Sequence, residues 1–356
     1  MNITQKTIAK KLGVSVSLVS RALSGNAFKI GASPKTIKRI IKEAKKLNYK
    51  PNPAALSLRG YPSMSIGILV KNFDDPYLGL IIETIYKEAI KRAMTVSLAG
   101  IPKNKTELNL LLRQNHNAII ICGSNVCGSW TKKVVDSGVK SLQIGYDKDI
   151  PGLNRVFIDE EKALNLILKH LLQIGHTKFL FVGIKDFSHI RRYKILKSRI
   201  LSLCNTSIKL AKIEFPNNYN QIPEQLKKSI KKNTPFTAII SGDDLAAIES
   251  LHFLRKKNIA IPDKISITGF DNIAFASKTS PPLTTVGINF KQMVKYALSF
   301  LTKSPYSEEG IKISFPPNLF IRKSTSAPLE KNTKKKEKKN ESYYQRKQKR
   351  NRTPCC

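Results

Sequence analysis

The sequence predicts an N-terminal all-α helix-turn-helix head with a hinge helix, a two-lobed α/β core and a disordered basic C-terminal tail. Three observations lead to this prediction. Short amphipathic helices with capping residues fill the start of the chain, apolar strands alternate with helices from residue 65 onward, and the C-terminal residues are almost entirely polar. These changes of pattern place the head at 1–50, the hinge at 51–61, the core at 62–327 and the tail at 328–356.

The head is predicted from residues that begin and end helices. Thr4 is the expected N-cap of a first helix, which ends at Gly13, where a left-handed residue is tolerated. Ser15 is the expected cap of a second helix, and Ser33 followed by Pro34 begins a third. The apolar residues at helical spacing are Ile8, Ala9 and Leu12, then Val19, Ala22 and Leu23, then Ile37, Ile40, Ile41, Ala44 and Leu47.

The core is predicted from nearly continuous apolar segments, which are typical of buried parallel strands between helices. Their alternation with helices predicts α/β layers, and a length of about 260 residues is large for one sheet and favours two lobes. The predicted strands are 65–70, 95–99, 118–122, 141–144, 178–182, 238–241 and 266–269. The clearest predicted helices are 77–94, 160–174 and 245–257.

The chain is strongly basic, with 62 Lys and Arg against 25 Asp and Glu, and a formal net charge of +37. Residues 1–60 hold 13 Lys or Arg and a single acid, Glu43. Such a head favours a polyanionic partner, most commonly nucleic acid. An AT-rich coding sequence is the other explanation for the lysines of the middle region, but it explains poorly why charge lies beside the helix-turn-helix. The tail has basic runs at 334–339 and 346–352 and too few apolar residues to form a core.

Nothing in the sequence predicts a membrane span, a metal centre or catalysis. No apolar run is long enough to cross a bilayer and no secretion signal is apparent, so we expect a cytoplasmic, nucleoid-associated bacterial protein. The five cysteines show no metal-ligand spacing and are expected to be reduced. Adjacent carboxylates occur at 74–75 and 243–244, but no nucleophile–base pair or phosphate-binding loop accompanies them. We therefore expect no enzyme activity, no cofactor and no metal.

Several blocks of sequence follow one another in a distinctive order. They are 8–23 in the head, 49–52 with 55–59 in the hinge, Asp75-Pro76-Tyr77, 159–163 with 170–176, 261–271, 282–286 and 321–325. In this order and spacing, from about residue 3 to 327, they resemble the lactose/galactose-repressor (LacI/GalR) family of bacterial transcription regulators. The resemblance implies a core like the periplasmic sugar-binding proteins with a small effector, a sugar or related metabolite, in its cleft. It also implies a homodimer, formed partly through a helix at 78–93, that represses transcription from a pseudo-palindromic operator in double-stranded DNA.

The second helix of a helix-turn-helix presents its N-terminal residues to base edges in the major groove. Val16 is expected to contact a thymine methyl group, Ser17 to bond to bases, and Arg21 to pair with guanine. Packing of Val16 in the core and a phosphate contact of Arg21 are the alternatives. The other expected DNA-binding residues are Thr7, Ser20, the hinge residue Asn52, and Leu58, which the resemblance implies is a minor-groove wedge. Leu58 could instead belong to the linker, and Leu18 and Leu56 depart from the family's usual threonine and arginine.

The resemblance also implies which side chains bind the effector. They are Asp75, Tyr77, Arg191 (or Arg192), Asp243 and Asp271. All except the arginine follow predicted strands, where α/β folds bind ligands. Helix capping or bracing of turns is the alternative role for Asp271 and for Asp244. Asp75 and Asp243 replace the family's usual asparagines, which indicates a ligand different from the well-known sugars, or a decayed site. The alternative function is a cytoplasmic small-molecule-binding protein that binds DNA only nonspecifically.

Overall fold

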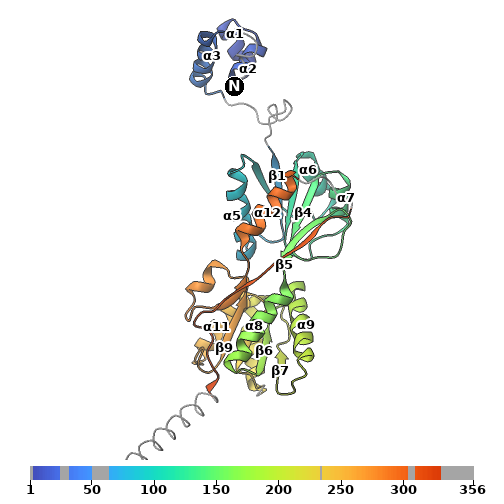
Figure 1. Ribbon diagram of the computed structural model, residues 1–356, viewed down its shortest axis with the longest axis vertical. Coiled ribbons are helices and arrows are strands. Elements are labelled where there is room, and N and C mark those ends of the chain that lie inside the picture. The colour runs from blue at the N-terminus through green and yellow to red at the C-terminus, as the bar shows by residue number, and fades with distance from the viewer. Residues whose placement is uncertain (1–2, 25–31, 50–63, 233–234, 304–308, 330–356) are drawn as a thin grey trace, which may run out of the picture. The chain divides into compact units, whose positions relative to one another are not determined.

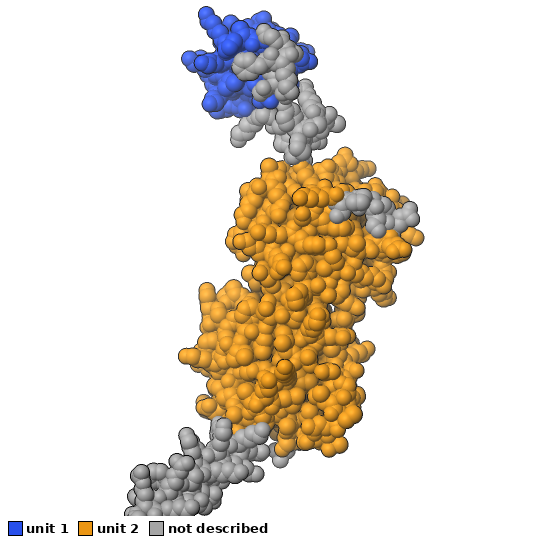
Figure 2. Space-filling view, in the orientation of Figure 1, with its two compact units in different colours: residues 1–63 blue, residues 64–356 orange. Residues whose placement is uncertain are grey.

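The structure is a computed structural model that describes residues 3–24, 32–49, 64–232, 235–303 and 309–329. The chain divides into two compact units, residues 1–63 and 64–356 (Figure 2). The hinge residues Asn52 and Leu58, the residues of the head loop at 25–31 and the tail from 330 onward lie outside the described residues.

The head consists of three helices in its described part, and their starts and ends follow the capping residues of the sequence. Thr4 caps α1 through its side chain, Gly13 ends that helix with a φ of 64°, and Ser15 and Ser33 cap the next two helices. Buried residues from all three helices form one small core, which includes Ile8, Val19 and Ile40. The helices are α1 (Gln5–Leu12), α2 (Val16–Leu23) and α3 (Pro34–Lys46).

The first lobe of the core contains a six-stranded sheet in the order β11-β5-β4-β3-β1-β2, with every neighbouring pair parallel. Helices α5 and α12 pack together on one face, and α6 and α7 cover the other (Figure 1). Its elements are β1 (Ser65–Val70), α5 (Pro76–Ile90), β2 (Thr95–Gly100), α6 (Lys105–Arg113), β3 (Ala118–Cys122), α7 (Ser129–Asp136), β4 (Lys140–Ile144), β5 (Asn154–Ile158), α12 (Phe290–Lys303) and β11 (Lys312–Phe315).

The second lobe contains another six-stranded sheet, in the order β12-β10-β9-β8-β6-β7, parallel except for the terminal pair β10–β12. Helices α10 and α11 pack on one side and α8 and α9 on the other. Its elements are α8 (Glu160–Ile174), β6 (Lys178–Val182), α9 (Phe187–Ser202), β7 (Lys209–Lys212), α10 (Ile222–Lys231), β8 (Ala238–Ser241), α11 (Asp244–Lys256), β9 (Ser266–Phe270), β10 (Thr284–Gly287) and β12 (Asn318–Phe320).

The chain crosses between the lobes three times: from β5 to α8, from β10 to α12, and from β11 to β12. Each lobe is therefore built from segments that are distant in sequence. The predicted two-lobed α/β class is confirmed, and each of the seven predicted strands is present within one residue of its expected ends. In the head, Ile41 is 37% exposed and lies outside the core, because the buried face of α3 passes through Ile37, Ile40 and Ala44.

None of the described helices is long and apolar enough to cross a membrane.

Candidate functional site

The outer face of α2 presents the residues predicted to read DNA. Val16 is 41% exposed, so its side chain is available at the surface rather than buried among the core residues. Ser17 and Arg21 are also exposed, at the first turn and one turn further along. Val19 and Ala22 point inward and anchor the helix on the core. The fold thus separates an anchoring face of α2 from an outward face on which Val16, Ser17 and Arg21 lie.

The residues predicted to contact phosphates lie near this face but also have local contacts. Thr7 is exposed, and its hydroxyl and that of Thr4 lie 3.0 Å apart in the capping box of α1. Ser20 is half-buried within α2. Two other basic side chains support the head itself: Lys11 pairs with Glu43 at 2.7 Å, and Arg39 donates to the carbonyl of Leu12. These contacts stabilise the packing of α1 on α3 and leave the outward face of α2 unobstructed by them.

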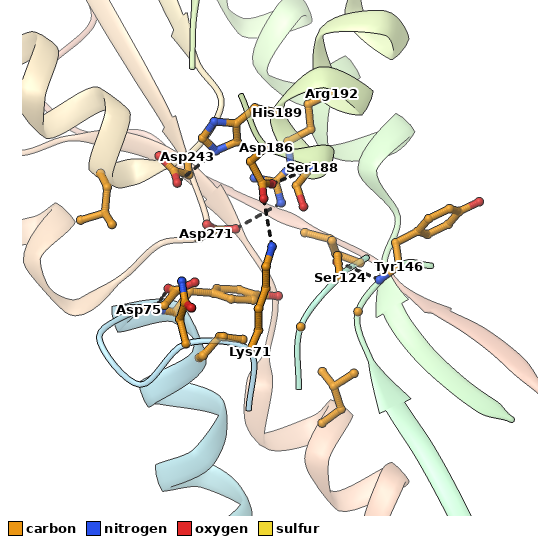
Figure 3. A pocket seen from close by; sticks show the side chains of 18 of the residues that line it. Lys71, Asp75, Ser124, Tyr146, Asp186, Ser188, His189, Arg192, Asp243 and Asp271 are labelled. Atoms are coloured by element: carbon orange, nitrogen blue, oxygen red, sulfur yellow. Dashed lines mark hydrogen bonds and ion pairs between the residues drawn. The ribbon is translucent and has the colours of Figure 1, made fainter. Parts of the chain in front are cut away.

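A pocket of about 270 Å³ lies between the two lobes of the core (Figure 3). Except for Arg192 within α9, its charged lining residues follow the carboxyl ends of β1, β5, β6, β8 and β9, which is where ligands bind in open α/β sheets. Three of the aspartates are also N-caps: their side chains accept backbone N–H groups at the starts of α5, α9 and α11. The charged lining residues are Lys71, Asp74, Asp75, Glu160, Asp186, Arg192, Asp243 and Asp271, and His189 lies among them.

An ion pair joins the two lobes across this pocket. Lys71 follows β1 of the first lobe, and its Nζ lies 2.9 Å from Oδ2 of Asp186 at the start of α9 in the second lobe (Figure 3). The contact with Lys71 outweighs the effect of burial and holds the pKa of Asp186 below its usual value. Because the two side chains belong to different lobes, this pair depends on how the lobes are closed.

Arg192 forms part of the wall of the pocket on the second lobe. Its Nε donates to Glu160 at 2.8 Å, its Nη1 donates to the carbonyl of Gly242 at 2.6 Å, and its guanidinium lies 3.6 Å from the ring centre of Phe270. These contacts fix the guanidinium, whose Nη2 lies 3.5 Å from Asp271. The neighbouring arginine of the sequence, Arg191, is not among the lining residues. Arg191 forms an ion pair with Glu160, and its guanidinium lies over the ring of Tyr146.

Asp243 is the centre of a hydrogen-bond network at the start of α11. Its carboxylate accepts from the hydroxyl of Tyr219 at 2.5 Å and from the N–H of Ala246 at 2.7 Å, and it lies 3.1 Å from Nε2 of His189. Burial alone would raise the pKa of Asp243, but the contacts with His189, Tyr219 and Ala246 outweigh it and lower the pKa. These contacts therefore favour the ionised form of the carboxylate.

The other two aspartates of the predicted site are held less firmly. Asp75 accepts the N–H of Tyr77 at 2.9 Å, and burial raises its pKa above the usual value. Asp271 is nine-tenths buried, with a φ of 104°, and burial raises its pKa well above the usual value. Burial likewise raises the pKa of Tyr77, with Asp271 adding to the effect. A ligand that donates hydrogen bonds or carries positive charge would offset the effect of burial and stabilise the ionised forms of Asp75 and Asp271.

Of the five residues predicted for the effector, Asp75, Tyr77, Asp243 and Asp271 line this one pocket, and the fifth position is taken by Arg192 rather than Arg191. The pocket is also lined by four residues that the sequence did not predict: Lys71, Asp186, His189 and Tyr219. His189 has a local signal that could have revealed it: glycines follow β6 and β8, and a Cβ at Gly242 would lie 2.6 Å from the His189 ring. Gly183 makes room for the same ring.

In the part of the chain that the structure describes, no group of three or more His, Cys, Asp or Glu side chains is arranged to hold a metal ion. The polar groups of the pocket instead suit an organic ligand with hydroxyl or amino groups, because carboxylates, an arginine and aromatic rings converge on a small volume.

The chain matches two family profiles. The profile "Bacterial regulatory proteins, lacI family" matches residues 4–52, and the profile "Periplasmic binding protein-like domain" matches residues 168–325. The chain is 26% identical over 338 residues to the HTH-type transcriptional regulator DegA of Bacillus subtilis (strain 168), covering 92% of this chain and 99% of that protein. It is also 26% identical over 349 residues to the HTH-type transcriptional repressor PurR of Pasteurella multocida (strain Pm70), covering 92% and 99%.

Among solved structures, the lac repressor dimer bound to operator and the anti-inducer ONPF is similar, with a TM-score of 0.77 and 21% identity. The similarity covers 92% of this chain and 100% of that chain. It therefore extends over both the helix-turn-helix head and the two-lobed core.

Proposed function

Because the chain belongs to the LacI/GalR family of transcriptional regulators, we propose that it represses transcription as a homodimer that releases or holds its operator in response to a sugar or related metabolite. It is a DNA-binding regulator with an effector-binding core. The observation that carries the proposal is the union, in one chain, of an outward-facing helix-turn-helix and a polar pocket between two lobes. We propose no enzyme activity for this pocket.

The head is proposed to read DNA through α2. Val16 and Ser17 at the start of the helix and Arg21 one turn on are exposed together, which suits insertion of the N-terminal end into the major groove. Arg21 is proposed to make a bidentate contact with guanine, and Thr7 and Ser20 to contact phosphates. Asn52 and the wedge Leu58 are proposed from the family resemblance of the hinge.

The effector is proposed to bind between the lobes, in contact with Asp75, Tyr77, Arg192, Asp243 and Asp271. Residues from both lobes line the pocket, so a ligand that bridges them changes the relative stability of open and closed arrangements. Closure of the lobes would change the affinity for the operator if it changes the spacing of the two hinges in a dimer. The open–closed equilibrium then couples the effector site to the DNA-binding site.

A dimer is supported by an apolar surface on the first lobe. Tyr86 and Ile90 on α5 are 55% and 53% exposed, and Leu98 on the neighbouring strand β2 is 48% exposed. Exposed large apolar side chains on adjoining elements mark interaction surfaces more often than scattered single ones do. We propose that this surface contributes to the contact between two copies of the chain.

The decisive experiment is a selection of random DNA duplexes by the full-length chain. An enriched palindrome with two half-sites supports the regulator. Recovery of sequence-independent duplexes, bound with an affinity that falls steeply with salt, would instead favour a small-molecule-binding protein that attaches nonspecifically to DNA.

The hinge has its own test once an operator is known. Leu58→Ala should weaken binding to the operator more than binding to unrelated DNA, because a minor-groove wedge stabilises only the bent, specific complex; the unstacking that it offsets costs a few kcal/mol. Affinities for both duplexes measured at one salt concentration give the comparison. Equal losses would count against a wedge and favour a role for Leu58 in the linker.

A further inference from the structure

The pocket between the lobes has the opposite charge balance to the chain as a whole. Six carboxylates line it, against one lysine and one arginine, whereas the whole sequence has 62 Lys and Arg against 25 Asp and Glu. The acidic lining residues are Asp74, Asp75, Glu160, Asp186, Asp243 and Asp271. This inversion is local, so it reflects the pocket rather than the composition of the protein.

Some of these carboxylates have cationic partners. Asp186 pairs with Lys71, and Glu160 pairs with both Arg191 and Arg192. The second of these arginines also approaches Asp271, with its Nη2 3.5 Å from Oδ1. Taken together, the cations around the pocket balance three of the carboxylates, and the exposed Asp74 is free to be solvated.

Asp243 has no lysine or arginine partner among the described residues. Its closest ring is His189, whose Nδ1 accepts the N–H of Ile184 at 2.9 Å and therefore carries no proton. His189 donates to Asp243 through Nε2. The other donors are the hydroxyl of Tyr219 and the N–H of Ala246. The negative charge of Asp243 is therefore hydrogen-bonded but is not paired with a lysine or arginine among the described residues.

Asp75 is the second unbalanced carboxylate. It lies on the first lobe, across the pocket from Asp243 (Figure 3), and its side chain accepts backbone N–H groups at the start of α5, with that of Tyr77 at 2.9 Å. Asp271 adds a third acceptor: it is nine-tenths buried, points into the pocket (Figure 3), and its Oδ2 has no partner among the described residues. Asp75, Asp243 and Asp271 all line this one pocket, together with Tyr219, whose hydroxyl donates to Asp243.

We propose that the effector carries a protonated amino group, which binds among Asp75, Asp243 and Asp271. This inference rests on the proposed effector role of the same pocket. A protonated amine has three donors and a positive charge, which match Asp75 and Asp243, acceptors on different lobes without a lysine or arginine partner, and the second oxygen of Asp271. The pocket volume of about 270 Å³ limits the ligand to a small molecule, and the rings of Tyr77 and Tyr219 offer apolar faces beside the carboxylates. An amino sugar or a small hydroxylated amine meets these requirements.

The test compares matched ligands on the full-length chain by isothermal titration calorimetry at pH 7. The pairs are glucosamine against glucose and galactosamine against galactose, with N-acetylglucosamine as a capped amine and glucose 6-phosphate as an anion. We expect at least one amino sugar to bind about tenfold or more tightly than its neutral partner, the size of one charge-assisted hydrogen bond, and the phosphate to bind most weakly. Equal affinities within each pair, tighter binding of the anion, or no binding by any amine would overturn the proposal.

Two variants locate the preference. Asp75→Asn and Asp243→Asn should each reduce the preference for the amine about tenfold while keeping one side-chain oxygen that can accept the N–H at the start of its helix. Asp136→Asn is the matched control, because that carboxylate is exposed at the end of α7 and does not line the pocket, and it should leave the preference within about twofold. An equal effect of all three substitutions would show a diffuse attraction rather than a built site, and would also overturn the proposal.

Failure of this inference can be distinguished from failure of the proposed function. If a neutral sugar releases a selected operator while the amines do not, the regulator stands and the charged ligand is wrong. If no operator can be selected but the amine preference and its loss in Asp243→Asn are observed, the pocket assignment stands and the specific regulator is wrong.

Discussion

The DNA-binding head and the effector pocket have opposite electrostatics in one chain. The head has one acid, Glu43, among its first 60 residues, and that acid is paired with Lys11. The pocket concentrates six carboxylates, of which Asp75 and Asp243 have no cationic partner in the described structure. The contrast teaches that net charge describes the partner of an exposed surface, where charges add, but not the partner of a cleft, where a few oriented groups decide.

The largest expected effect tests whether the two regions are stable independently. Ile40→Ala should destabilise the head by about 2–5 kcal/mol, because Ile40 is fully buried in a small core. Specific DNA binding should be lost while the thermal transition of the core is unchanged, as calorimetry of the full chain can show. The neighbouring Ile41→Ala is the control: Ile41 is 37% exposed, so little change is expected. A parallel loss of core stability would mean that the two units unfold together.

The next effect separates the regions by pH. Burial raises the pKa of Asp244, which lies behind the pocket, to about 7. A carboxyl group with a raised folded-state pKa stabilises the fold while it is protonated, so this contribution is lost as the pH rises toward 7. Between pH 5 and 7, where unfolded carboxyl groups are ionised, the loss is on the order of 3 kcal/mol. Denaturant unfolding of the core at several pH values between 5 and 7 should show this fall in the free energy of unfolding.

Asp244→Asn should flatten that dependence, because asparagine does not titrate, its amide oxygen can still accept the N–H of Ile273, and its amide nitrogen can donate to the hydroxyl oxygen of Thr285. The stability of the head should change little between pH 5 and 7 in both proteins, because the contact with Lys11 lowers the pKa of its single acid, Glu43, which stays ionised over this range. If the free energy of unfolding of Asp244→Asn falls with pH as steeply as that of the unchanged protein, the pH dependence belongs to Asp75 and Asp271, whose pKa values are also raised.

A smaller effect sharpens the specificity of the head. Arg21→Ala should weaken operator binding by about 1–3 kcal/mol relative to unrelated DNA if Arg21 pairs with guanine. Arg21→Lys keeps the charge but loses the bidentate geometry, so it should lose specificity and retain nonspecific affinity. Competition binding with single-base operator variants measures both. If Arg21→Lys keeps full specificity, the arginine contacts phosphate only.

The smallest expected effect concerns the basic tail. Removing residues 329–356 deletes 11 Lys or Arg and three Glu, so nonspecific DNA affinity and its dependence on salt should both fall, by less than about tenfold in affinity at physiological salt. Site choice in a duplex selection should remain the same. A changed site preference would mean that the tail takes part in recognition rather than in general attraction.

Local patterns predicted most of the elements. The caps Thr4, Ser15 and Ser33 fall where the head helices begin, because capping depends on residues within one turn. Short late strands such as β11 and β12 were not predicted, because their pairing partners β5 and β10 lie far away in sequence and their own periodicity is weak. The same limit applied to the arginine of the pocket: Arg191 and Arg192 are adjacent, and only packing against Phe270 and Glu160 selects Arg192.

The sequence by itself determined the helix-turn-helix, the alternation of strands and helices, the family and four of the pocket residues, because these depend on local spacing or on blocks that keep their order. The tertiary structure decided that Lys71 meets Asp186 across the lobes and that His189 meets Asp243. It also decided that Asp75 and Asp243 remain without a cation. The three crossings of the chain between the lobes bring these side chains together, although they are distant in sequence. The charge balance of the cleft depends on which charged side chains become neighbours in this way.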